Sequence, residues 1–85
     1  MKAMDIIIRH KGGLHARPAG QLVGVSGKYD CKVELEYKGK NAAGNSILKI
    51  LALAVPEGAT FQAKADGPEA DNALSAIKSF IESLD

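Results

Sequence analysis

A histidine and an arginine two residues apart lie in the segment of this chain that is best suited to chemistry. Residues 12–19 read Gly-Gly-Leu-His-Ala-Arg-Pro-Ala, which places His15 in a glycine-containing loop just before a predicted helix. The first N–H groups of a helix have no partner within it, and the helix dipole favours negative charge there, so the position suits a phosphoryl group. Arg17 adds a positive charge whose planar fork binds phosphate oxygens in pairs. Pro18 has no backbone N–H, so the backbone donors available at the helix start are those of the residues beside it.

Histidine suits reversible transfer of that group. Near neutral pH an imidazole is largely unprotonated and nucleophilic, so it can attack phosphorus, and the phosphoramidate that forms is reactive enough to be passed on. The helix dipole contributes roughly 0.3–1 kcal/mol at an exposed site and up to ~2 kcal/mol when partly buried, a scale that fits a reversible carrier. Taken residue by residue, a solvated loop histidine beside a solvated arginine is an equally good interpretation of His15 and Arg17.

Composition restricts the other functions. The 85 residues suffice for one domain, 1–85, with 46% apolar and 25% charged residues and a formal net charge of +1. No basic face or aromatic platform points to nucleic acid. The longest nearly apolar run, 47–55, is interrupted by Lys49 and is far shorter than the ~20 residues needed to cross a bilayer. With no signal peptide recognised, we expect a cytoplasmic protein without membrane insertion.

Hydrophobic periodicity predicts the elements that must position the histidine. Apolar residues alternate with charged ones through 31–38, which indicates a strand with one wet face, and an apolar stripe indicates a helix over 70–84. The full prediction is strands at 4–9, 31–38, 40–43 and 60–65, and helices at 16–27, 47–53 and 70–84. The order β-α-β-β-α-β-α predicts an α+β fold, an open-faced two-layer sandwich whose four-stranded antiparallel sheet carries three helices on one face.

The string Gly-Leu-His-Ala-Arg-Pro-Ala closely resembles the active-site signature of the HPr family, the histidine-containing phosphocarriers of the phosphoenolpyruvate:sugar phosphotransferase system. The resemblance extends over essentially the whole chain, and its element order agrees with the order predicted above. Further segments that look like family positions are 28–30, 35–40, 45–48, 56–59 and 67–74.

The resemblance implies a role for each site residue. His15 would be phosphorylated at Nδ1 by phospho-Enzyme I and would donate to the IIA domain of a sugar permease. Arg17 matches the family arginine that contacts the phosphoryl group, and the backbone N–H groups of Ala16 and Arg17 would be further donors. The chain would then be a carrier rather than a free-standing enzyme, without a cofactor, and a monomer so that its carrier face stays free for successive partners.

Ser46 is a second family position. It matches the serine that an ATP-dependent kinase modifies in many Gram-positive relatives, which would add a serine kinase or phosphatase and a transcription regulator to the partners. The alternative is a plain helix N-cap, because Ser46 precedes an apolar run. A phosphate is chemically permissible at a helix start, so the residues leave both interpretations open.

The short helix at 47–53 is apolar nearly all round, so a small domain is not expected to bury all of it. Ile50 and Leu53 are expected in the core. The family docks its partners with this helix and the first one, which predicts a docking surface of Gly20, Gly24, Ile47, Leu48, Lys49 and Leu51. The alternative is that the chain simply buries the helix.

The sequence departs from the family pattern in two places. Gly12 replaces a small polar residue, so a side-chain hydrogen bond that orients the loop is expected to be missing. Gly20, Gly24 and Gly27 fall on the first predicted helix, where relatives carry larger or basic side chains. Glycine within a helix costs roughly 1 kcal/mol relative to alanine, so we expect a soft helix with a weakly charged docking face.

The remaining reactive side chains are given structural roles. His10, at the end of the first strand, is interpreted as a solvated or edge histidine, and Cys31 as a small buried hydrophobe. No metal site is predicted, because His10, His15 and Cys31 do not have a metal-binding spacing.

Three functions remain open: a sugar-transport phosphocarrier, a regulatory interaction module that keeps His15, and a carrier in a specialised relay such as nitrogen-related or dihydroxyacetone phosphorylation. An intact His15 with Arg17 favours the first, and the glycine-rich helix keeps the second open.

Overall fold

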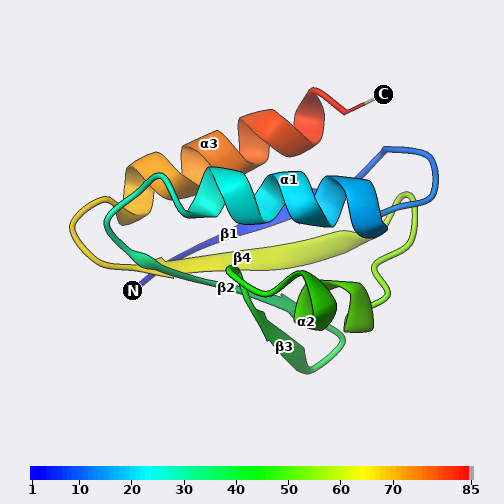
Figure 1. The fold of residues 1–85 in the computed structure, drawn as a ribbon, viewed down its shortest axis with the longest axis horizontal. Helices are drawn as coiled ribbons and strands as arrows, with labels where there is room; N and C mark the ends of the chain where they lie inside the picture. Colours follow the sequence, from blue (N-terminus) through cyan, green and yellow to red (C-terminus); the bar gives the residue numbers. More distant parts are fainter. Residues whose placement is uncertain (85) are drawn as a thin grey trace.

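Four antiparallel strands form one sheet in the order β1–β4–β2–β3 (Figure 1). In the computed structural model, which describes residues 1–84, the strands are β1 (Lys2–Ile7), β2 (Lys32–Tyr37), β3 (Lys40–Ala43) and β4 (Thr60–Asp66). Burial alternates along β4, which lies between β1 and β2: Phe61, Ala63 and Ala65 are buried, and the residues between them are half-buried. One face of the sheet is therefore apolar and covered, and the other is polar.

Three helices cover the apolar face: α1 (Ala16–Ser26), α2 (Ile47–Ala52) and α3 (Ala70–Glu82). α1 and α3 lie side by side over the sheet, and α2 lies beside β3 (Figure 1). This arrangement confirms the predicted α+β open-faced sandwich and its β-α-β-β-α-β-α order. On the uncovered face Lys64 donates a hydrogen bond to Glu36, which raises the pKa of the lysine.

The connections interlock. β1 and β2 both pair antiparallel with β4, so they run in the same direction and α1 crosses over β4 to join them. In the same way, α2 joins β3 to β4 across β2. Ile7 at the end of β1 pairs with Thr60 at the start of β4, so the loop that precedes α1 and the segment that follows α2 meet at one edge of the molecule.

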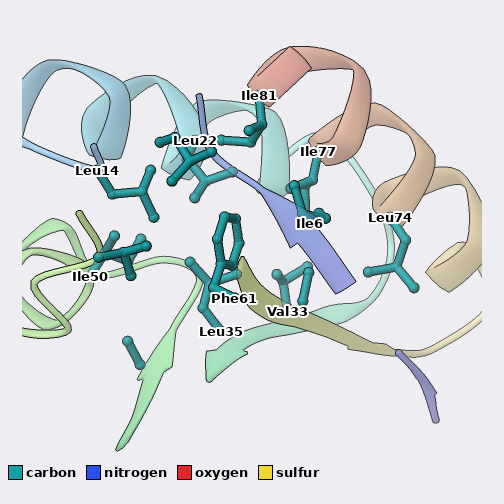
Figure 2. Close-up of a cluster of buried hydrophobic side chains, with 14 of the residues drawn as sticks. Ile6, Leu14, Leu22, Val33, Leu35, Ile50, Phe61, Leu74, Ile77 and Ile81 are labelled. Carbon is teal, nitrogen blue, oxygen red and sulfur yellow. The ribbon is translucent and has the colours of Figure 1, made fainter. Parts of the chain in front are cut away.

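The core lies between the sheet and the three helices. Figure 2 shows the ring of Phe61 among side chains from the helices and the neighbouring strands, including Leu22 of α1 and Leu35 of β2. Phe61 and Ile50 are at most 1% exposed, so α2 is anchored to the same core as the sheet. Burial of these aliphatic side chains is the main force that holds α1 on the sheet. It stabilises the fold by about 25 cal/mol for each Å² of apolar surface removed from water.

The bounds of six elements differ from the prediction, β2 (31–38 predicted) by one residue at each end and β4 (60–65 predicted) by one residue at its end. β1 spans Lys2–Ile7 rather than 4–9, because the ladder with β4 begins at Lys2 and the chain beyond Ile7 pairs with a loop. α1 ends at Ser26, so Gly27 is its C-cap and only two glycines lie within the helix. α2 ends at Ala52 instead of 53, and α3 at Glu82, while residue 85 lies outside the described part of the chain.

Cys31 packs against the core as predicted, but it is not fully buried. Cys31 is half-buried and precedes β2, where its backbone lies against Gly67 in the turn before α3. Partial burial raises the pKa of its thiol, and the carboxylates of Glu69 and Asp30 raise it further. Its side chain keeps the alternation of β2, with Lys32 exposed and Val33 buried after it, although the strand itself begins at Lys32.

The close approach of the loop before α1 to the segment after α2 is testable by a pair of glycine substitutions. Gly13 and Gly39 have φ angles of +70° and +79°, but a Cβ on Gly13 would lie 2.2 Å from the carbonyl oxygen of Val55, whereas nothing lies within 4 Å of one on Gly39. Gly39→Ala is expected to lower the free energy of unfolding by about 1–2 kcal/mol through backbone strain alone. Gly13→Ala is expected to cost about 3 kcal/mol or more, because the clash adds to the strain. Urea denaturation measures both, and equal losses would contradict the close approach.

Candidate functional site

The loop between β1 and α1 holds His15 by two buried anchors. Ile8 and Leu14 are 0% and 3% exposed. Ile8 donates from its backbone N–H to the carbonyl of Ala59 at 3.0 Å and accepts from the N–H of Gly58 at 2.7 Å. Leu14 donates to the carbonyl of Val55 at 3.0 Å. His15, next along the chain, is exposed to solvent on a loop fixed at both ends.

The N-terminus of α1 presents free donors beside this histidine. His15 is the N-cap with extended backbone, and its carbonyl accepts the first helical hydrogen bond, from Ala19 at 3.0 Å. Pro18 has no N–H, so Ala16 and Arg17 supply the two N–H groups at this end that precede the helical ladder. The first turn contains no acidic residue. The helix end is therefore open to an anion and carries no competing carboxylate.

Arg17 completes a positively charged junction. Its side chain is exposed, and within residues 1–84 it forms no ion pair. A guanidinium without a carboxylate partner keeps its donors available for a phosphate. The structure thus brings the predicted residues His15, Ala16 and Arg17 together at one loop–helix boundary.

His10 lies against the ring of His15, a contact that its interpretation as a solvated or edge histidine did not include. Its Nε2 atom lies 3.4 Å from Nε2 of His15, and the two ring centroids are 5.3 Å apart at an interplanar angle of 34°. Spacing gave no signal for this contact, because residues five apart meet only when the loop turns back. The turn is closed by a hydrogen bond from Gly13 N–H to the carbonyl of His10, at 2.9 Å.

Gly12 leaves room for the histidine ring. It has a φ angle of +90°, and a Cβ at this position would lie 3.0 Å from Cδ2 of His15. The absence of a side chain at Gly12 therefore leaves space for the ring of His15, in addition to the predicted loss of a hydrogen bond. Because Cδ2 and Nε2 share one edge of the imidazole, Gly12 and His10 both lie at that edge, and Nδ1 belongs to the other.

Ser46 is the N-cap of α2, as one of the two interpretations predicted. Its backbone is extended, and its hydroxyl oxygen accepts a hydrogen bond from the N–H of Lys49 at 3.3 Å. The residue is half-buried. These contacts account for a serine at this position by helix capping.

The apolar surface of α2 is divided as expected, with one exception. Ile47 and Leu48 are 42% and 80% exposed, whereas Ile50 and Leu53 are buried. Leu51 was expected on the exposed surface, but it is half-buried and packs against the core, because it faces inward next to Ile50. We call Ile47 and Leu48 the apolar patch.

Of the two glycines within α1, Gly20 lies next to the apolar patch and Gly24 does not. A Cβ on Gly20 would lie 3.8 Å from Cδ1 of Ile47, whereas nothing lies within 4 Å of one on Gly24. Lys49 is exposed beside the patch. The patch and the α1 face near Gly20 are therefore continuous.

The described residues 1–84 also contain a cavity that lies away from His15. A shallow cavity of about 640 Å³ lies at the opposite end of α1, lined by residues that include Ser26 and Asn45. Among residues 1–84, no three histidine, cysteine or acidic side chains lie together in a way that could hold a metal ion. No helix in the same range has the length and apolar character needed to cross a membrane.

Comparison with known proteins agrees with the geometry. Residues 3–83 match the protein-family model described as the PTS HPr component phosphorylation site. The chain is 37% identical over 82 residues to the phosphocarrier protein HPr of Pseudomonas aeruginosa, covering 95% of this chain and 91% of that protein.

Solved structures give the same result. HPr from Thermoanaerobacter tengcongensis superposes with a TM-score of 0.93 at 35% identity, covering 98% of this chain and 93% of that one. Crh of Bacillus subtilis, a catabolite repression protein crystallised as a domain-swapped dimer, superposes with a TM-score of 0.77 at 30% identity, covering 96% and 94%. The chain thus belongs to the HPr family, the phosphocarrier proteins of the phosphotransferase system.

Proposed function

We propose that His15 takes a phosphoryl group at Nδ1 from phospho-Enzyme I and passes it to the IIA domain of a sugar permease in the cytoplasm. The observation that carries this proposal is the position of His15, exposed at the start of α1 beside two free N–H groups and an unpaired arginine. Nε2 faces His10 at 3.4 Å, so Nδ1 is the ring nitrogen left for phosphorus.

The transfer is a direct displacement. The lone pair of Nδ1 attacks phosphorus, a new N–P bond forms, and the bond from phosphorus to the donor protein breaks with its electron pair leaving on the donor. The N–H groups of Ala16 and Arg17 and the guanidinium of Arg17 face the charge that moves onto the phosphoryl oxygens. Because these donors are in place before the phosphoryl group arrives, the protein needs little reorganisation either to accept the group or to donate it.

The apolar patch and the neighbouring face of α1 are the proposed docking surface for both partners. Ile47 and Leu48 are exposed without cover, next to Gly20 on the helix that begins at His15. One surface would then serve donor and acceptor in turn, which is consistent with the proposal that the carrier acts as a monomer.

Phosphorylation of Ser46 by a kinase stays a prediction. The hydroxyl is an N-cap, and a phosphate at that place would put a dianion beside Ile47 and Leu48 of the apolar patch. Such a charge would disfavour apolar docking, which is a physical route to regulation. Likewise, a carrier in a specialised relay would use the same His15 with a different donor.

The carrier function is tested by phosphotransfer from phosphoenolpyruvate through purified Enzyme I, followed by intact mass. The wild-type chain is expected to gain one acid-labile phosphoryl group, and His15→Ala none, because the attacking nitrogen is removed. Ser46→Ala is the matched control and is expected to gain the group normally. No transfer to the wild type from Enzyme I of the same organism would contradict the sugar-relay function and favour a regulatory module or another relay.

The role of Arg17 is tested by the rate of the same transfer. Arg17→Ala is expected to slow it roughly tenfold to hundredfold, since a charged donor to the phosphoryl oxygens is lost. Arg17→Lys is expected to fall between wild type and Arg17→Ala, because the charge is kept and the planar fork is lost. Rapid-quench kinetics gives both rates. Unchanged kinetics in Arg17→Ala would show that the guanidinium does not reach the phosphoryl group.

The docking surface is tested by two isoleucines with the same exposure. Ile47 and Ile7 are both 42% exposed, but Ile7 lies on β1 between the buried Ile6 and Ile8 and so faces the side of the sheet away from the helices. Ile47→Asp is expected to raise the KM for phospho-Enzyme I about five- to tenfold by loss of apolar contact. Ile7→Asp should leave this KM unchanged. Equal effects of the two substitutions would place the docking surface elsewhere.

A further inference from the structure

We propose that His10 is a positioning residue for the phosphoryl transfer, which accepts a hydrogen bond from Nε2–H of His15 and shares that proton as the phosphoryl group arrives and leaves. The inference rests on the proposed function of His15. Its starting point is the contact between the two rings, whose Nε2 atoms are 3.4 Å apart.

The contact restricts the tautomers of the pair. Two neutral imidazole nitrogens can share a hydrogen bond only if one carries the proton and the other a lone pair. If His10 were the donor, the single proton of a neutral His15 would sit on Nδ1, and the attacking lone pair would be lost. If His15 donates from Nε2, its Nδ1 is free to attack. Only the arrangement with His10 as acceptor fits a nucleophilic Nδ1.

The same acceptor is useful during the transfer itself. When the lone pair of Nδ1 forms the bond to phosphorus, the bond from phosphorus to the donor breaks, and the ring of His15 becomes a phosphorylated imidazolium that still carries Nε2–H. The lone pair of His10 can accept this hydrogen bond or take the proton. The positive charge is then spread over two rings, and no proton has to leave to solvent.

The reverse holds for onward transfer. A proton returned from His10 to Nε2 makes the phosphorylated ring cationic, which turns Nδ1 into a better leaving group. The bond from Nδ1 to phosphorus then breaks with its electron pair returning to Nδ1, while the acceptor protein forms the new bond. His15 ends neutral, with its proton on Nε2, and the carrier is ready for another cycle.

The loop holds the two rings in this relation. The carbonyl of His10 accepts from Gly13 at 2.9 Å, and the backbone on either side is fixed by the buried Ile8 and Leu14. Gly12 between them has no side chain that would displace the ring of His15. Hydrogen bonds of catalytic groups are often long in the free protein and shorten in the complex, which is consistent with 3.4 Å.

The test combines two substitutions at His10 with two measurements. His10→Phe keeps a planar ring but removes both nitrogens, and His10→Gln keeps an amide oxygen that can accept the hydrogen bond. Nitrogen-15 NMR of the imidazoles reports the tautomer of His15, and rapid-quench phosphotransfer from phospho-Enzyme I gives kcat and KM separately. Amide spectra of each variant establish that it is folded.

The expected result has three parts. The wild type shows the Nε2–H tautomer of neutral His15, and His10→Phe shows a mixture of both tautomers. In His10→Phe, kcat falls roughly tenfold with KM unchanged, because the lost hydrogen bond acts on the reacting ring and not on docking. His10→Gln restores the tautomer and part of kcat. If His10→Phe fails to fold, His10→Lys, which offers only donors, is expected to lower kcat instead.

Several outcomes would overturn the proposal. These are an Nδ1–H tautomer in the wild type, an unchanged kcat in folded His10→Phe, or a rise in KM alone, which would make His10 a docking residue. Failure of the proposed function is distinguishable: the wild type would then accept no phosphoryl group from phospho-Enzyme I. In that case the nitrogen spectra still decide whether His10 accepts the hydrogen bond from His15.

Discussion

The attachment of the β1–α1 loop to the segment after α2 is the constraint on which the rest of the site depends. Leu14 donates to the carbonyl of Val55, and the backbone at Gly13 approaches that segment so closely that no side chain fits between them. Because Leu14 is buried, the next residue, His15, emerges from a fixed point. The histidine ring thereby stays accessible to solvent while its backbone is held in place.

The same attachment ties the proposed site of phosphoryl transfer to the proposed docking surface. The segment that ends with Ala59 begins at the end of α2, whose Ile50 is buried in the core and whose Ile47 and Leu48 face solvent. A shift of α2 would therefore move the loop that carries His15. The interlocked connections have the same effect, because they bring the start of β4 beside the end of β1. The proposed docking surface and the proposed site of phosphoryl transfer thus share one mechanical unit.

The sequence predicted the fold and the central site residues because both depend on local patterns. Alternation along β2, the stripe on α3 and the Gly-Leu-His-Ala-Arg-Pro string are readable over a few residues. What these patterns did not show depends on tertiary structure. Cys31 continues the alternation of β2 but lies just before the strand and is only half-buried, and His10 meets His15 only because the glycine loop turns back. Leu51 is apolar like its neighbours, and only the packing of α2 decides which of them is covered.

The two glycines within α1 lower the stability of the helix but leave a flatter surface on it. Each costs roughly 1 kcal/mol relative to alanine in a helix interior. Gly20 lies against Ile47, so a side chain there would alter the contact between α1 and α2. Gly24 has open space around it and an ordinary helical backbone, so neither packing nor conformation requires glycine. What Gly24 does provide is a face of low relief on the helix that begins at His15, and under the proposed function such a face would give a partner access to the exposed ring.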